Sequence, residues 1–90
     1  MATLTAEPKF DVKQAAEIAF NYLRSLMPIP ADDISLEEVE LDGKEWHVTL
    51  GFTSKHQRNI AAIMGDSRVY KVFKIDSTTG RVLSMRIRKP

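Results

Sequence analysis

The fold is decided by residues 39–52, VELDGKEWHVTLGF. Asp42-Gly43 is a strong two-residue hairpin signal, because both central positions of a type I′ turn need positive φ. After it, apolar residues alternate strictly with others from Trp46 to Phe52, as in a strand with one buried face. The stretch therefore predicts an antiparallel hairpin. Its strands cover about residues 34–41 and 44–52.

The apolar positions change phase within the first of these strands. Ile34 and Leu36 are two residues apart, as are Val39 and Leu41, but the step from Leu36 to Val39 is odd. An extra residue in one strand of a pair has this effect. We predict a bulge at Glu37–Glu38.

A second hairpin is predicted from strands at about 68–76 and 81–88. They flank Ser77-Thr78-Thr79-Gly80, a turn in which Gly80 can take the left-handed conformation. We place one apolar row of this hairpin on the same sheet face as Trp46. This row contains Val69, Phe73, Ile75, Leu83, Met85 and Ile87.

An amphipathic helix is predicted at about 11–27. Its apolar residues recur at steps of three and four: Val12, Ala15, Ala16, Ala19, Tyr22, Leu23 and Leu26. Asp11 and Gln14 can form a capping box, and Pro28 and Pro30 end the helix. We expect an α+β fold, with this helix packed on one face of a four-stranded antiparallel sheet.

Length and composition predict one small domain. The 90 residues are 43% hydrophobic and 28% charged, as in ordinary globular proteins. We assign residues 1–9 to a flexible arm and residues 10–90 to a single domain. There is no cysteine, and no apolar run approaches the ~20 residues that cross a bilayer, so we expect a cytoplasmic protein without membrane contact.

Residues 53–67 form a long connection between the hairpins. Ser54 and Gln57 resemble a capping box, and Gly65 could end a helix. We predict a short helix at about 55–64 or a mobile flap.

Charge is distributed unevenly along the chain. Residues 1–45 contain ten acidic and four basic residues, and residues 46–90 contain two acidic and nine basic residues. Either the basic half binds an anionic partner, or the two halves neutralise each other across strands.

The sheet face away from the helix is the predicted site of partner binding. Tyrosine and arginine are enriched at protein interfaces, and both occur on this face. We predict a non-enzymatic module that binds an unknown protein partner or forms a homodimer. The candidate residues are His47, Thr49, Tyr70, Val72, Lys74, Arg86 and Arg88, beside which Val82 and Ser84 are also expected. The alternative is a solvated face covered by long Lys and Arg stems. Nucleic acid is disfavoured, because only one exposed aromatic, Tyr70, is available for base stacking.

A small-ligand pocket beneath residues 53–67 is the alternative functional hypothesis. Apolar residues under a loop are a common setting for such pockets. Its expected walls are Tyr22, Trp46, Phe52, Ile60 and Met64.

No sequence motif indicates catalysis. His47 and His56 lack the spacing of metal ligands, and the four glycines are too scattered for a phosphate-binding loop. We therefore predict no enzyme activity, no metal site and no cofactor.

The second hairpin carries a family resemblance. Tyr70-x-Val72-x-x-Ile75-Asp76-x-x-x-Gly80-x-Val82-Leu83 resembles the aspartate-turn-glycine hairpin of PepSY-type domains. The resemblance implies a cystatin-like arrangement of one helix and antiparallel strands. Many PepSY-type domains are exported or membrane-tethered and are associated with restraining peptidases, whereas we expect no export signal or anchor here. The chain also resembles short stand-alone bacterial proteins with a Trp strand and a Tyr-Lys-Val-Phe hairpin.

Overall fold

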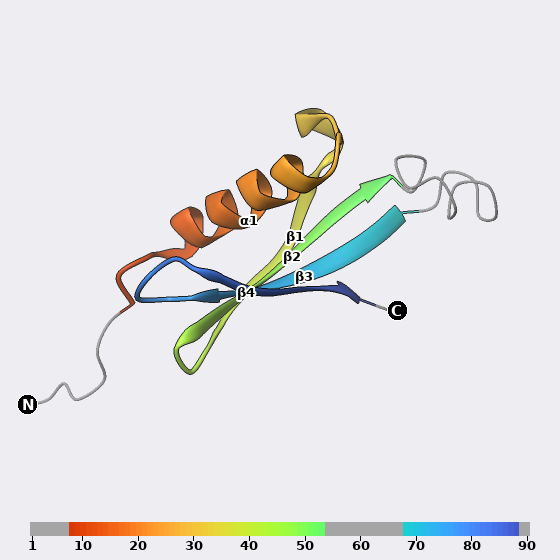
Figure 1. The fold of residues 1–90 in the computed structure, drawn as a ribbon. Coiled ribbons are helices and arrows are strands. Elements are labelled where there is room, and N and C mark those ends of the chain that lie inside the picture. The colour runs from red at the N-terminus through yellow and green to blue at the C-terminus, as the bar shows by residue number, and fades with distance from the viewer. Residues whose placement is uncertain (1–7, 54–67, 89–90) are drawn as a thin grey trace, which may run out of the picture.

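The computed structural model describes residues 8–53 and 68–88 (Figure 1). They form one helix and one antiparallel sheet of strand order β1-β2-β3-β4, with the helix on one sheet face. This arrangement confirms the predicted α+β fold. The elements are α1 (Val12–Leu26), the 3-10 helix η1 (Ala31–Asp33), β1 (Ser35–Asp42), β2 (Glu45–Thr53), β3 (Arg68–Asp76) and β4 (Val82–Arg88). The short helix or flap predicted within 53–67 falls on residues 54–67, outside the described residues.

Helix α1 begins at the predicted capping box. The Asp11 carboxylate accepts the backbone N–H of Gln14 at 2.8 Å, and the Gln14 side chain accepts the backbone N–H of Asp11 at 2.9 Å. Two N–H groups that a helix start leaves open are thereby satisfied. The helix ends at Leu26, because Pro28 disfavours the helical conformation of Met27, which is extended.

The core lies between α1 and the two central strands. Ala15, Ala19 and Leu23 of α1 are fully buried at steps of four residues, so one stripe of the helix faces the sheet. Because two of these side chains are methyl groups, the helix backbone can approach the strands closely. The strands contribute Trp46, Val48, Leu50 and Phe52 from β2 and Val69, Phe73 and Ile75 from β3.

The first hairpin differs from the prediction in its turn. Asp42 pairs with Glu45, so the turn residues are Gly43 and Lys44. Gly43 has φ 65°, and no described residue other than glycine has positive φ. A glycine first, followed by a residue with negative φ, fits a type II′ turn and not the predicted type I′ turn over Asp42-Gly43. Both strands consequently lie one residue later than predicted.

The predicted bulge in β1 is confirmed. The register shifts between Leu36 and Glu38, which leaves Glu37 as the extra residue. Val39 and Leu41 thereby return to the sheet face that carries Leu36.

A second bulge lies in β4, where none was predicted. Ile75 pairs with Val82 and Lys74 pairs with Ser84, so Leu83 is the extra residue. Val82 packs against the core, whereas Leu83 is 46% exposed. The predictions that Leu83 belongs to the core and that Val82 lies on the opposite face are both wrong, because the inserted residue reverses the alternation before it.

The turn between β3 and β4 is held by Asp76 and Gly80. The backbone N–H groups of Thr79 and Thr78 donate to the Asp76 carboxylate at 3.0 and 2.8 Å. These hydrogen bonds hold the pKa of Asp76 below its ordinary value. Gly80 has φ 78°, and the Phe10 ring occupies the space where a Cβ would stand.

The residues before α1 are tied to this turn. The backbone N–H groups of Lys9 and Phe10 donate to the carbonyl of Ser77 at 2.9 and 3.1 Å, and Trp46 Nε1 donates to the carbonyl of Phe10 at 2.7 Å. Lys9 falls within the predicted flexible arm, and its backbone is hydrogen-bonded. Residues 1–7 lie outside the described residues.

One helix leaves both sheet edges partly uncovered. A helix is about 10 Å wide, and four strands about 4.8 Å apart span a greater width. Leu36 and Leu41 of β1 are 53% and 41% exposed, and Ile87 of β4 is 54% exposed. Apolar surface therefore remains on each side of α1.

Candidate interaction surface

The sheet face away from α1, which we call the open face, brings the predicted partner-binding residues together. Strand pairing places Thr49, Val72 and Arg86 in one row across β2, β3 and β4. His47 and Lys74 form the row on one side, and Tyr70 and Arg88 form the row on the other. The seven candidates are thus neighbours on one face. Ser84 joins them beside Lys74.

Tyr70 lies over Gly51 at one end of the open face. A Cβ built on Gly51 would stand 2.9 Å from Tyr70 Cε1 and 3.1 Å from Glu37 Oε2. The missing side chain of Gly51 therefore makes room for the tyrosine ring. An aromatic residue laid across a neighbouring glycine in this way covers backbone that the glycine leaves open.

Gly51→Ala is expected to lower the free energy of unfolding by about 1–2 kcal/mol, because the new methyl group overlaps the Tyr70 ring. Urea denaturation measures the change. In a Tyr70→Ala background the same substitution should cost clearly less, since the ring is gone. Equal costs in the two backgrounds would show that the ring contact is not the cause.

Charge on the open face changes sign from one edge to the other. Glu38 and Glu40 lie on β1, at the rows of Thr49 and His47, whereas Arg86 and Arg88 lie on β4. Arg88 Nη1 lies 3.3 Å from Glu38 Oε1, and both side chains are about half exposed. An exposed pair of this kind contributes at most about 1 kcal/mol.

The open face is partly covered by its own side chains. Thr49, in its middle, is only 3% exposed. Ser84 Oγ is buried without a hydrogen-bond partner among the described residues. The Arg88–Glu38 contact joins its two edge strands. The candidate residues therefore share one surface, and an exposed ion pair crosses it from β4 to β1.

A polar clasp, made by Asp33, Thr53, Arg68 and Ser35, ties η1 to three strand ends. The Asp33 carboxylate accepts the backbone N–H of Thr53 at 2.9 Å and its hydroxyl at 2.7 Å. Arg68 donates to the same carboxylate at 3.0 Å and to Ser35 Oγ at 2.6 Å. In the sequence, Asp33 lies between the predicted helix and the first predicted strand, and no motif assigns it a role. The clasp joins residues 15 to 35 positions apart, and no local pattern signals such pairs.

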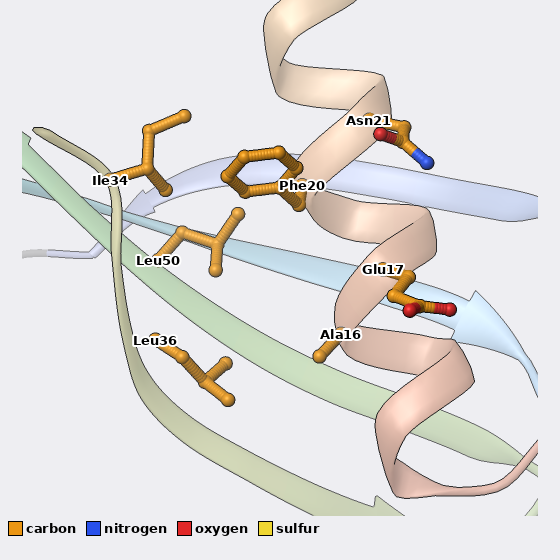
Figure 2. A pocket seen from close by; sticks show the side chains of 7 residues that line it. All are labelled: Ala16, Glu17, Phe20, Asn21, Ile34, Leu36 and Leu50. Atoms are coloured by element: carbon orange, nitrogen blue, oxygen red, sulfur yellow. The ribbon is translucent and has the colours of Figure 1, made fainter. Parts of the chain in front are cut away.

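A hollow of about 420 Å³ lies beside α1, on the side of β1. Figure 2 shows Phe20, Ile34, Leu36 and Leu50 pointing toward one another, while Glu17 and Asn21 point away from them. Ala16 completes the lining. The hollow is therefore apolar between the helix and the strands, with polar groups on the outer side of α1.

Of the predicted pocket residues, the three that the structure describes, Tyr22, Trp46 and Phe52, do not line this hollow. Trp46 and Phe52 are buried in the core, 6% and 0% exposed. Tyr22 packs edge-on against Phe73, with ring centroids 6.3 Å apart. Ile60 and Met64 lie outside the described residues.

Lys71 is a buried residue that the sequence analysis passed over. It lies on the α1 side of β3, between Leu50 and Ile87, and is 8% exposed. Burial lowers the pKa of its ammonium group. Within residues 8–53 and 68–88 no carboxylate forms an ion pair with it. The strict alternation of Val69, Phe73 and Ile75 includes position 71 and could have identified it.

Lys71→Met is expected to raise the urea midpoint at pH 7. Because the pKa is lowered from 10.5, the folded state binds the proton less tightly than the unfolded state, and the stability of the wild type rises as the pH approaches 10.5. The difference in urea midpoint between Lys71→Met and the wild type should therefore shrink as the pH rises from 7 toward 10.5. Lys74→Met, on the opposite face of the same strand, is the matched control and should show no such gain.

Side chains that could bind a metal or take part in acid-base catalysis rarely lie together in the part of the chain that the structure describes. No three His, Cys, Asp or Glu side chains gather there as metal ligands. His47 Nε2 has Glu45 Oε1 at 3.4 Å, the long end of a hydrogen bond. Among the same residues, no helix has the length and apolar character needed to cross a bilayer.

No family model, curated protein or solved structure matches the chain.

Proposed function

We propose that this protein is a non-enzymatic binding module that associates with a second copy of itself through the sheet. The observation that carries the proposal is the division of the open face into an acidic edge on β1 and a basic edge on β4. A surface with both charges at opposite ends is complementary to another copy of that surface. Complementary potentials favour encounter and fix orientation.

The local ion pairs support a role in binding over one in catalysis. Asp33 with Arg68 and Glu38 with Arg88 are carboxylate and guanidinium pairs that connect strands. Neither pair joins a nucleophile to a base, as an acid-base or nucleophilic mechanism requires. We assign Asp33 and Arg68 to the fold, and Glu38 and Arg88 to the interface.

Light scattering across a range of protein concentrations tests self-association. The mean mass of the wild type should rise with concentration and fall back at high salt, because exposed charges are screened. Arg86→Glu should weaken association by about tenfold or more, since it places like charges together. Arg81→Glu is the matched charge reversal, at an exposed residue outside β4, and should change little. A wild type that stays monomeric at millimolar concentration would refute the proposal.

A small apolar ligand in the hollow is a second candidate function. Its volume of about 420 Å³ lies within the usual range of ligand pockets. Ala16→Phe should fill the hollow and abolish binding of a neutral solvatochromic dye, whereas Ala31→Phe, on exposed η1, should not. Dye binding that survives Ala16→Phe would exclude the hollow as its site.

A further inference from the structure

We infer that the second copy docks edge to edge and head to tail, with its β4 paired antiparallel to β1 of the first. The inference rests on the self-association proposed above and specifies its geometry. In the inferred register Glu38 lies opposite Arg88 of the second copy, and Glu40 lies opposite Arg86. Residues 38–42 of one copy then pair with residues 84–88 of the other.

These two segments are the regular parts of the edge strands. The bulge in β1 ends at Glu38 and the bulge in β4 ends at Ser84, so each segment continues to the end of its strand without a register shift. Among residues 8–53 and 68–88, no strand pairs with the outer side of either segment, because β1 and β4 are the edges of the sheet. Such edges can accept another strand.

The faces of the two segments match residue by residue. Glu38 and Glu40 lie on the open face, as do Arg86 and Arg88. Val39 and Leu41 lie on the α1 side, as do Met85 and Ile87. The register therefore places acidic residues opposite basic ones and apolar residues opposite apolar ones. Directly opposed pairs of both kinds stabilise antiparallel sheets.

Charge disfavours the symmetric alternatives. Pairing β1 with β1 of a second copy would oppose glutamates, and pairing β4 with β4 would oppose arginines. Like charges directly opposite each other destabilise a strand pair. The head-to-tail contact avoids both arrangements, and it also keeps strand directions alternating, because β4 already runs antiparallel to β1 within the sheet.

The α1 side of the sheet has room for this contact. Four strands about 4.8 Å apart would place successive helices roughly 19 Å apart, and a helix is about 10 Å wide. The space between the helices would receive Leu36 and Leu41 of one copy and Ile87 of the next, all of which are 41–54% exposed in the single chain. The hollow beside Phe20 lies on the same side, where Leu36 of β1 lines it.

The Arg88–Glu38 pair within one chain does not prevent the contact between two copies. Both side chains are about half exposed, so the pair is weak within one chain. On association Arg88 would leave its own Glu38 for Glu38 of the neighbouring copy. Each contact between two copies replaces two internal Arg88–Glu38 pairs with one Glu38–Arg88 pair and one Glu40–Arg86 pair across it, so the number of ion pairs is unchanged. The added contacts are the backbone ladder and the apolar row.

Single-cysteine variants test the register, because the chain has no cysteine of its own. Neighbouring Cα atoms in antiparallel strands lie about 4.5–5.5 Å apart, within disulfide range. Val39→Cys and Ile87→Cys, mixed and oxidised, should give a crosslinked heterodimer, whereas neither alone should crosslink. Leu83→Cys is exposed like Ile87 but lies in the β4 bulge, and mixed with Val39→Cys it should not crosslink.

The outcomes separate this inference from the proposed function. If the wild type self-associates and the Val39→Cys and Ile87→Cys mixture does not crosslink, the register is overturned and self-association stands. Self-crosslinking of either single variant would overturn the head-to-tail geometry. A monomeric wild type would overturn both.

A charge exchange between positions 40 and 86 tests the inferred register independently, because both residues are exposed and the hydrophobic core is unchanged. Glu40→Arg and Arg86→Glu should each reduce association by about tenfold or more when alone. An equimolar mixture should recover it, because arginine at position 40 then meets glutamate at position 86. Failure of the mixture to recover association would contradict the assigned pair.

Discussion

Phe73→Ala is expected to lower the free energy of unfolding by about 3–5 kcal/mol, the range for truncation of a tightly packed phenylalanine. Phe73 is fully buried in β3, between Val48 of β2 and Met85 of β4. The Tyr22 ring packs edge-on against it. Because small domains have total stabilities of about 5–15 kcal/mol, the loss should be visible as a large drop in the urea midpoint.

Phe20→Ala is the matched control for this truncation. Phe20 is half-buried and lines the open hollow, so it loses fewer contacts and leaves no enclosed cavity. Its cost should be clearly smaller. Equal costs for the two variants would contradict the placement of the core between α1 and the central strands.

Asp33→Ala should lower the free energy of unfolding by about 2–3 kcal/mol. The carboxylate accepts hydrogen bonds from the backbone and hydroxyl of Thr53 and from Arg68, and its removal breaks all three of these hydrogen bonds. Thermal or urea denaturation measures the effect. Three separate strand ends should loosen together, because the clasp reaches β1, β2 and β3.

Asp32→Ala provides the comparison, because Asp32 is exposed in the same 3-10 helix. Its effect should stay within about 0.5 kcal/mol. Arg68→Ala should cost less in the Asp33→Ala background than in the wild type, since the two side chains interact. Additive losses would show that the ion pair contributes nothing of its own.

Those parts of the fold that depend on local pattern were predictable. The alternation from Trp46 to Phe52 gave the buried face of β2, and Asp11 with Gln14 gave the helix start. The β1 bulge could be located because it left an odd step between two apolar residues. In each case neighbouring residues alone carry the signal.

The errors arose where distant residues decide local geometry. The chain enters β4 beside Gly80, whose free side is filled by the ring of Phe10. The β4 bulge that follows places Leu83 outside the core. No sequence pattern within residues 77–88 indicates the contact between Gly80 and Phe10. Lys71 was passed over for a different reason, because a charged residue is rarely buried without a partner.

Which residues share the candidate surface was predictable, but the opposite charges of its two edges were not. Alternation places His47, Thr49, Tyr70, Val72 and Lys74 on the open face, and the structure agrees. Nothing in the sequence assigns the glutamates of β1 to this surface, because the sequence does not show which strands form the edges of the sheet. Once β1 and β4 are seen to be the two edges, the same glutamates become one half of a complementary pair.

The hydrogen bonds between Phe10 and the second turn bear on how this chain would fold during synthesis. A ribosome releases the N-terminal residues first, so α1 emerges long before Ser77 and Gly80 exist. The entry to α1 is held by the Ser77 carbonyl and by the ring contact with Gly80. Until that turn has formed, the residues at the start of α1 have no hydrogen bonds to it. The apolar stripe of α1 cannot be fully buried before the second hairpin has formed. Folding of this domain should therefore be completed only after the second hairpin has left the ribosome, as a single cooperative step.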